Sequence, residues 1–160
     1  MGQIDFYLHF ICKALYDLTL PTFAYRLRES ERGVAIYDVC RGKYVALSPE
    51  EWVRQHFIHY LLALGCPRSL MRVERGHRYN RQAQRTDILV YGREQQPWLL
   101  VECKAPTIAL GQPVMEQALA YNHVLKAAFV AVSNGIQHAY FARDEAQGVH
   151  LPLEGLPSFG

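Results

Sequence analysis

Two short apolar segments that also carry charged residues place the tightest constraint on the fold of this chain. The segments are Thr86–Tyr91 and Trp98–Lys104, and a polar turn from Gly92 to Pro97 separates them. Apolar runs of this length predict two adjacent strands that are buried on both faces. Glu102 and Lys104 are next-but-one neighbours, so in a strand they point to the same face. Burying them there costs free energy unless they are paired or bind something.

Asp87 stands at the start of the first strand, so two carboxylates and a lysine are expected on one part of the sheet. Carboxylate oxygens suit Mg²⁺, with Mn²⁺ as an alternative, so Asp87 and Glu102 are candidate metal ligands and the Cys103 carbonyl oxygen is a further one. Lys104 would orient or help to deprotonate a water and offset phosphate charge. This set predicts a magnesium-dependent nuclease. The alternative is a plain Glu–Lys pair on an edge strand, but an exposed edge should alternate polar and apolar residues.

The composition narrows the class of protein. With 160 residues, of which 50% are hydrophobic and 20% charged, the chain is expected to form one domain with one core. The net charge of +2 means that any nucleic-acid footprint must be local. None of the four cysteines forms a C-x-x-C pair, which argues against zinc and favours reduced thiols in the cytoplasm. No signal peptide or membrane contact is expected.

Hydrophobic patterns and helix-capping residues predict an α/β domain with a mixed sheet. An amphipathic helix from Ile4 to Leu20 would make residues 1–24 an N-terminal helical extension of a main domain at residues 25–160. The other expected elements are strands at 34–39, 44–47, 70–74, 127–132 and 138–142, and helices at about 49–64 and 112–126.

Both of these helices carry polar residues with two open interpretations. Ser48 and Glu51 form a capping box, which explains Glu51 fully, yet a helix this apolar could also point Glu51 at the sheet. On the second helix Gln117 and Tyr121 border the core-facing stripe and need polar partners. Those partners are either backbone groups or a catalytic site that includes Lys104. Glu51, Gln117 and Tyr121 are therefore candidate catalytic residues.

The segment from Arg68 to Arg85 is rich in arginine, and Glu74 is its only acid. It leads directly into Asp87, so it suits a phosphate backbone, although a solvated surface loop explains the charge run equally well. The candidate residues for nucleic-acid contact are Arg72, Arg75, His77, Arg78, Arg81 and Arg85.

Several short motifs in a fixed order resemble the PD-(D/E)xK nuclease superfamily, and within it the N-terminal nuclease domain of type I restriction enzyme R proteins. Thr86 stands where the superfamily name has proline. The matching segments are Leu47–Gln55, Arg85–Tyr91, Leu100–Pro106, Gln117–Asn122 and Val132–Gly135.

The resemblance implies a restriction-endonuclease-like core, with a central mixed sheet flanked by helices. It implies magnesium at Asp87 and Glu102, Lys104 as the catalytic lysine, Glu51 as an acid from the helix, and Gln117 with Tyr121 as the Q-x-x-x-Y pair found in some branches. The expected activity is hydrolysis of DNA, chiefly duplex. The alternatives are a catalytically silent module that binds DNA or docks a partner, and an RNA-directed nuclease. The chain has no Walker-type phosphate loop, so a separate motor or specificity protein is an expected partner, as is a second copy of the chain.

Overall fold

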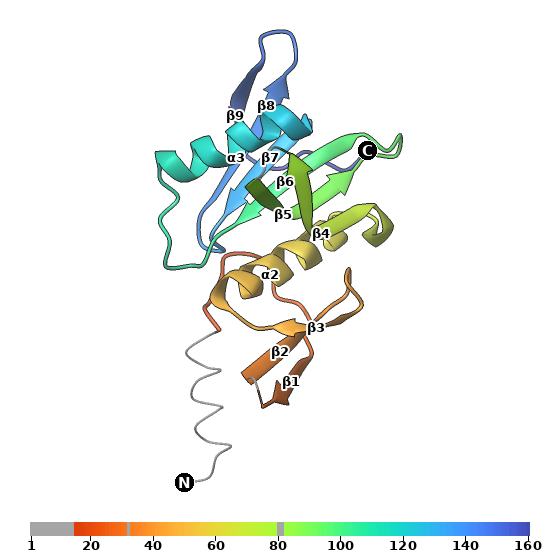
Figure 1. Ribbon diagram of the computed structural model, residues 1–160, viewed down its shortest axis with the longest axis vertical. Helices are drawn as coiled ribbons and strands as arrows, with labels where there is room; N and C mark the ends of the chain where they lie inside the picture. Colours follow the sequence, from red (N-terminus) through yellow and green to blue (C-terminus); the bar gives the residue numbers. More distant parts are fainter. Residues whose placement is uncertain (1–14, 32, 80–81) are drawn as a thin grey trace.

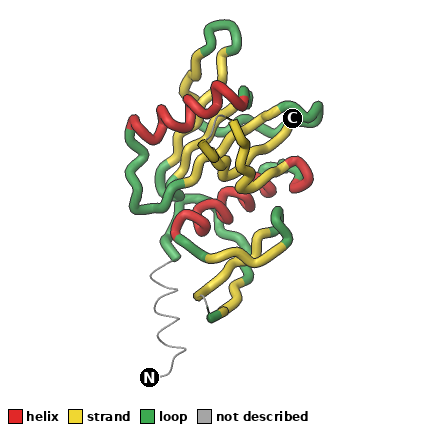
Figure 2. The backbone as a smooth tube through the Cα atoms, in the orientation of Figure 1, coloured by secondary structure: helices red, strands yellow, loops and turns green. Residues whose placement is uncertain are grey.

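The computed structural model describes residues 15–31, 33–79 and 82–160, and for Ser30, 74–79 and 82–85 it describes the backbone alone. A six-stranded sheet lies between two helices, α2 and α3, and a smaller sheet lies on the far side of α2 (Figure 1). In Figure 2 the two helices run across opposite sides of the larger sheet.

The larger sheet is mixed. Its strands β4 to β9 are neighbours in chain order, and only β6 and β7 run parallel. The helix α3 (Gln112–Leu125) forms the crossover between that parallel pair. This arrangement confirms the predicted α/β class and is consistent with a restriction-endonuclease-like core. The strands are β4 (Met71–Tyr79), β5 (Gln82–Tyr91), β6 (Pro97–Cys103), β7 (Phe129–Ser133), β8 (His138–Asp144) and β9 (Val149–Leu153).

The smaller sheet is antiparallel, with the order β1 (Leu27–Ser30), β2 (Gly33–Asp38) and β3 (Lys43–Ala46). The turn between β2 and β3 contains Gly42 at φ +66°, a conformation that glycine adopts without steric cost. After β3 the chain enters α2 (Pro49–Ala63), and Ser48 caps that helix as predicted.

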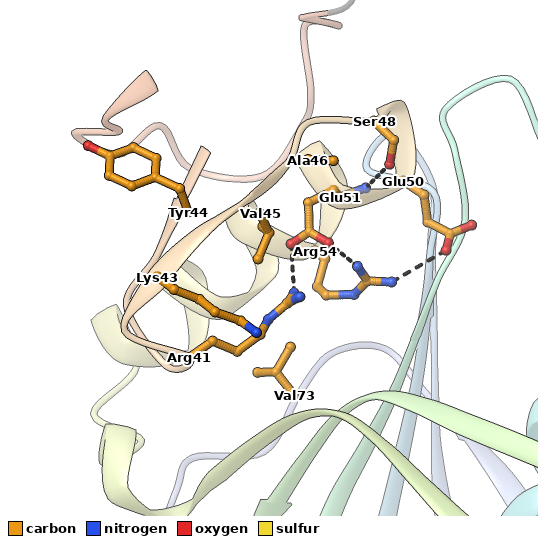
Figure 3. Close-up of a pocket in the computed structure, with 10 residues that line it drawn as sticks. All are labelled: Arg41, Lys43, Tyr44, Val45, Ala46, Ser48, Glu50, Glu51, Arg54 and Val73. Carbon is orange, nitrogen blue, oxygen red and sulfur yellow. Dashed lines mark hydrogen bonds and ion pairs between the residues drawn. The ribbon is translucent and has the colours of Figure 1, made fainter. Parts of the chain in front are cut away.

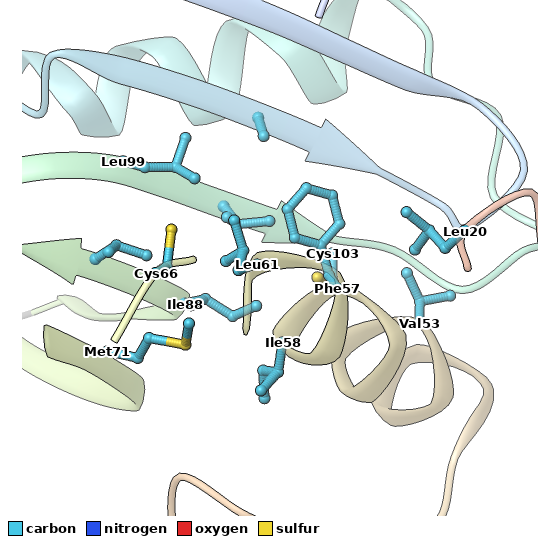
Figure 4. Close-up of a cluster of buried hydrophobic side chains, with 13 residues drawn as sticks. Leu20, Val53, Phe57, Ile58, Leu61, Cys66, Met71, Ile88, Leu99 and Cys103 are labelled. Atoms are coloured by element: carbon cyan, nitrogen blue, oxygen red, sulfur yellow. The ribbon is translucent and has the colours of Figure 1, made fainter. Parts of the chain in front are cut away.

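The core confirms that β6 is buried on both faces. On one face Leu99 and Val101 belong to the same buried cluster as Phe57 of α2 (Figure 4). On the other face Leu100 belongs to a second cluster with Ala118 of α3. Alternate side chains of β6 therefore pack against two different helices, and for this reason the segment is apolar throughout.

Three expectations need correction. The N-terminal helix expected to end at Leu20 falls mostly outside the described residues, and residues 15–20 are not helical. The arginine-rich segment is a hairpin of β4 and β5 rather than a loop, because the backbone of residues 75–79 pairs with that of residues 82–86. Strands β1 and β9 were not expected, since each is short and largely exposed. The division at residues 24 and 25 stays a prediction. Within the described ranges, no helix is long and apolar enough to cross a bilayer.

The central position of β6 makes a stability prediction. Replacing Leu99, which is fully buried, with alanine should lower the free energy of unfolding by about 2–5 kcal/mol, because the change leaves a cavity under α2. Leu151→Ala is the matched control, since that leucine is 49% exposed on β9 and its loss should cost about 0.5 kcal/mol or less. Denaturant unfolding of both variants measures the difference, and similar losses would contradict this description of the core.

Candidate active site

Asp87, Glu102 and Lys104 come together where β6 ends beside the middle of β5. Asp87 was expected at the start of its strand, but β5 begins five residues earlier because its first half pairs with β4. The antiparallel register pairs Ile88 with Val101, so the next position brings Asp87 beside Glu102. Lys104 follows β6, and its Nζ donates a hydrogen bond to Glu102 Oε1 at 2.6 Å. Both of these side chains are partly open to solvent, with exposures of 22% and 19%. The three residues singled out in the sequence thus form one accessible cluster.

The charges in this cluster change the protonation of its members. Burial and the neighbouring charge of Asp87 raise the pKa of Glu102 above its ordinary value, although Lys104 opposes them. Burial lowers the pKa of Lys104, but the hydrogen bond and charge of Glu102, with Asp87, outweigh it and leave that pKa raised. Lys104 is therefore protonated at neutral pH, which suits donating hydrogen bonds better than accepting a proton.

A third carboxylate, Glu50, lies in the same electrostatic field. Burial and the charge of Asp87 raise the pKa of Glu50, whereas Arg54 and Lys104 lower it. Its Oε1 accepts a hydrogen bond from Arg54 Nη2 at 3.3 Å, and its side chain is 46% exposed. The first turn of α2 thus supplies an acid to the cluster, and that acid is the neighbour of the predicted Glu51.

Glu51 itself is buried in a different set of contacts. Its backbone N–H donates to Ser48 Oγ at 3.0 Å, which confirms the predicted N-cap. Its carboxylate accepts hydrogen bonds from Arg41 Nη2 and Gln55 Nε2, each at 2.8 Å, and from Arg54 (Figure 3). The side chain of Glu51 is only 5% exposed. Glu51 is therefore part of a buried ion-pair network with Arg41 and Arg54 next to the cluster.

Arg54 connects this network to Asp87. Its Nη2 donates to Asp87 Oδ1 at 2.5 Å, and its Nη1 donates to Glu51. The other oxygen of Asp87 accepts the backbone N–H of Cys103 at 2.7 Å. Burial lowers the pKa of Arg54, but the charges of Asp87 and Glu51 together outweigh burial and leave that pKa raised, so the guanidinium stays charged. Asp87 is consequently held in place by both α2 and β6.

Asp38 extends the network into the smaller sheet. It is fully buried, and its Oδ1 accepts the backbone N–H groups of Cys40 and Arg41 at 2.7 and 2.8 Å. Its Oδ2 accepts Arg41 Nε at 2.6 Å and Gln55 Nε2 at 2.9 Å. Beside these residues a cavity of about 700 Å³ opens between β3 and the first turns of α2 (Figure 3).

The two candidates on α3 differ. The Tyr121 hydroxyl is buried and has no hydrogen-bond partner in the part of the chain that the structure describes. Burial and the charge of Glu102 raise its pKa, so this hydroxyl faces the field of the cluster. Gln117 is exposed, and among the described residues its side chain makes no hydrogen bond to the acids.

The predicted nucleic-acid contacts are only partly described. The Arg72 guanidinium donates to the backbone carbonyls of Ser69 and Met71 at 2.7 and 2.9 Å. The side chains of the other five candidates lie outside the described residues, so their role stays a prediction. These are Arg75, His77, Arg78, Arg81 and Arg85.

Sequence reasoning missed Glu50, Arg41, Asp38 and the role of Arg54. One signal was present: Arg54 stands with Gln55 and His56 between the apolar pairs Trp52–Val53 and Phe57–Ile58 of a largely apolar helix, and a buried arginine needs carboxylate partners. Asp38 and Arg41 gave no comparable signal, because polar residues are ordinary in a turn.

The donor set of the cluster fits a divalent cation. Across the network five carboxylates face three cations among the described residues: Asp38, Glu50, Glu51, Asp87 and Glu102 against Arg41, Arg54 and Lys104. At the cluster itself Glu50, Asp87 and Glu102 supply the carboxylate oxygens that Mg²⁺ prefers. No three acidic, histidine or cysteine side chains of the described ranges converge into a metal cage. Mg²⁺ does not require one, since one or two carboxylates with waters and substrate phosphates suffice.

Comparison with known proteins gives one family. The family model described as type I restriction enzyme R protein N terminus matches residues 49–157, which include the whole cluster but not β1–β3. The search of curated proteins finds no match. Among solved structures, a fragment described as an HsdR subunit of a type I restriction enzyme from Vibrio vulnificus YJ016 is 26% identical, with a TM-score of 0.36. The match covers 55% of this chain and 16% of that one, so this chain spans a small part of its length.

The central position of Arg54 makes a second stability prediction. Arg54→Met should lower the free energy of unfolding by about 3–5 kcal/mol, because it leaves Glu51 and Asp87 buried without their shared partner. Arg143→Met removes a pair to the exposed Glu145, and it should cost about 1 kcal/mol or less. Chemical denaturation of both variants tests this, and an Arg54 variant as stable as the Arg143 variant would contradict the assigned role.

Proposed function

The chain belongs to the family of type I restriction enzyme R protein N termini, and we propose that it is a divalent-metal-dependent endonuclease that hydrolyses phosphodiester bonds in DNA. The observation that carries the proposal is the meeting of Asp87, Glu102 and Lys104 where β6 ends beside the middle of β5. Perturbed acids that are partly open to solvent are typical of functional sites.

In this proposal Asp87 and Glu102 hold Mg²⁺ or Mn²⁺, with the Cys103 carbonyl oxygen as a further ligand. Bound there, the ion supplies Lewis-acid stabilisation of phosphate charge and a more acidic water. Lys104 is protonated and donates hydrogen bonds to the attacking water or to a phosphate oxygen. Arg54 and the Cys103 N–H fix the position of Asp87, so they are positioning groups rather than catalytic ones.

Glu50 and Tyr121 complete the proposed site. Glu50 is the acid from α2 that shares the field of Asp87 and Lys104, and it can accept a proton or a hydrogen bond from a water. The Tyr121 hydroxyl is buried with no described partner, so its proposed role is to act on Glu102 through its dipole rather than to touch the substrate. We assign Gln117 no role of its own, because it is exposed.

Duplex DNA is the proposed substrate, with a second copy of the chain or a separate motor or specificity protein as partner. Family membership supports this choice, since the family model describes the N terminus of a restriction enzyme subunit. A silent DNA-binding module and an RNA-directed nuclease are the rival functions. Competition among duplex DNA, single-stranded DNA and RNA separates the substrates, while metal dependence separates cleavage from simple binding.

Cleavage of a supercoiled plasmid in Mg²⁺ or Mn²⁺ tests the proposal. Lys104→Met should reduce the cleavage rate by about 10²- to 10³-fold, because it removes a charged donor aimed at the reacting groups. Glu102→Gln should reduce it at least as much, and chelation of the metal should abolish it. Glu116→Gln is the matched control, because that carboxylate is exposed on α3 and pairs only with Gln112 among the described residues.

Two outcomes would contradict this proposal. One is a wild-type protein that binds DNA independently of metal and never cuts it, which would favour the silent module. The other is cleavage that survives both Glu102→Gln and Lys104→Met with unchanged metal dependence. Circular dichroism of each variant separates loss of chemistry from loss of fold.

The neighbouring acids Glu50 and Glu51 give a matched pair of variants. Glu50→Gln should lower cleavage while leaving stability equal or higher, because it relieves repulsion from Asp87. Glu51→Gln should lower stability by about 3–5 kcal/mol, because Arg41 and Arg54 lose a buried carboxylate. Rates and unfolding curves of both variants decide between the residues. If the Glu50→Gln variant kept full activity and the Glu51→Gln variant were stable but inactive, Glu51 rather than Glu50 would be the acid that α2 supplies to the site.

A further inference from the structure

We propose that the outer face of the sheet β1–β3 is a second DNA-binding surface, which holds the phosphate backbone of the strand that enters the catalytic cluster. The proposal rests on the proposed function for its ligand but uses residues outside the region that the family model matches. It concerns Arg26 and Arg28 with Tyr37 and Tyr44, and Lys43 beside them.

Strand alternation divides the residues of this sheet between two faces. Ile36 and Asp38 of β2 are fully buried, and Asp38 bonds to Gln55 of α2, so their face is the one toward α2. Tyr37 and its cross-strand partner Tyr44 therefore point to the outer face. Arg28 of β1 lies on this outer face, Arg26 directly precedes that strand, and the described strands carry no acid on this face.

The arginines on this face are held in place by the tyrosines. The Arg26 guanidinium carbon lies 3.9 Å from the centre of the Tyr37 ring, and that of Arg28 lies 4.0 Å from the centre of the Tyr44 ring. The two rings meet edge to face at 5.3 Å. A stacked guanidinium keeps its N–H groups at the rim, where they are free to form paired bonds to phosphate at a reduced entropic cost.

The spacing of the two guanidiniums suits a nucleic-acid strand. Arg26 and Arg28 are next-but-one neighbours, so their backbones are about 7 Å apart along the strand. Successive phosphates of a nucleic-acid strand have a similar separation. Both arginines are exposed, and the only described contacts of their side chains are with the tyrosines.

The same strand leads to the proposed catalytic site. Residues 43–46 of β3 line one wall of the cavity of about 700 Å³, and Glu50, Glu51 and Arg54 line the wall beyond it (Figure 3). Lys43 is exposed at this wall, and no ion pair of its ammonium is found among the described residues. Lys43 pairs with Asp38, so it points to the α2 side of the small sheet, and a polyanion on the outer face would reach it by passing around the edge strand β3 toward Glu50.

Binding of a duplex oligonucleotide tests this inference, with Ca²⁺ in place of Mg²⁺ and again in chelator, as a function of salt. Arg26→Gln/Arg28→Gln should raise the Kd several-fold and reduce the slope of log Kd against log salt by about 2, because two phosphate contacts are lost. Arg26→Lys/Arg28→Lys keeps the charge and should retain most of the slope. Lys43→Gln leaves the stacked pairs intact and should reduce the slope by about 1.

The control is Arg93→Gln/Arg143→Gln, which removes the same charge far from this face. Arg93 is in the turn between β5 and β6, and Arg143 is near the end of β8. Equal salt slopes in the two double variants, with the slope of Lys43→Gln unchanged, would overturn the inference. It would also be overturned if Arg26→Gln/Arg28→Gln bound DNA normally but bound anionic lipid vesicles more weakly than the wild type. Binding in chelator needs no catalysis. An uncut plasmid would therefore refute the proposed nuclease activity and leave the measured DNA binding by this face unaffected.

Discussion

A single buried guanidinium holds the functional end of this molecule together. Arg54 extends from α2 and bonds to Asp87 on β5 while it also bonds to Glu51 on its own helix. Removing such an ion from water costs several kcal/mol, and charge-assisted hydrogen bonds to more than one carboxylate offset that cost. The bond to Asp87 fixes the helix relative to the strand ends. Apolar contacts such as those in the cluster of Phe57 and Leu99 are non-directional, so the ion pair adds a directional contact to them.

The carboxylates of the cluster at this end lower the stability of the fold, and their chemistry gives a reason for them to be there. Glu50, Asp87 and Glu102 repel one another, and burial adds to the repulsion by raising the pKa of Glu50 and of Glu102. Lys104 and Arg54 relieve only part of this, so the site carries more negative charge than its own cations neutralise. A fold selected for stability alone would replace one of these acids. Their presence together is the physical reason to expect a cationic ligand at this end of the sheet.

The sequence predicted the parts of the fold that follow from local patterns, and it failed where contacts are distant in the chain. The apolar runs of β5 and β6, the Ser48 cap and the spacing of Glu102 and Lys104 are all local, and the structure contains each of them. Glu50 could not be chosen over Glu51 from the sequence. Glu51 is sequestered because Arg41, ten residues earlier, joins Arg54 and Gln55 in binding its carboxylate. Likewise β1 has no apolar pattern, because its outer face carries arginines stacked on tyrosines of other strands.

The smaller sheet determines how α2 presents its first turn, although it lies outside the region that defines the family. Adjacent residues on a helix point about 100° apart, so fixing one of them fixes the direction of the next. Arg41, held by the buried Asp38, binds Glu51 and turns it toward the smaller sheet. Glu50, the preceding residue, is left half-exposed, and it feels the charge of Asp87. The turn between β2 and β3 thus helps to hold Glu51 in the ion-pair network, and Glu50 remains as the helix acid that shares the field of Asp87.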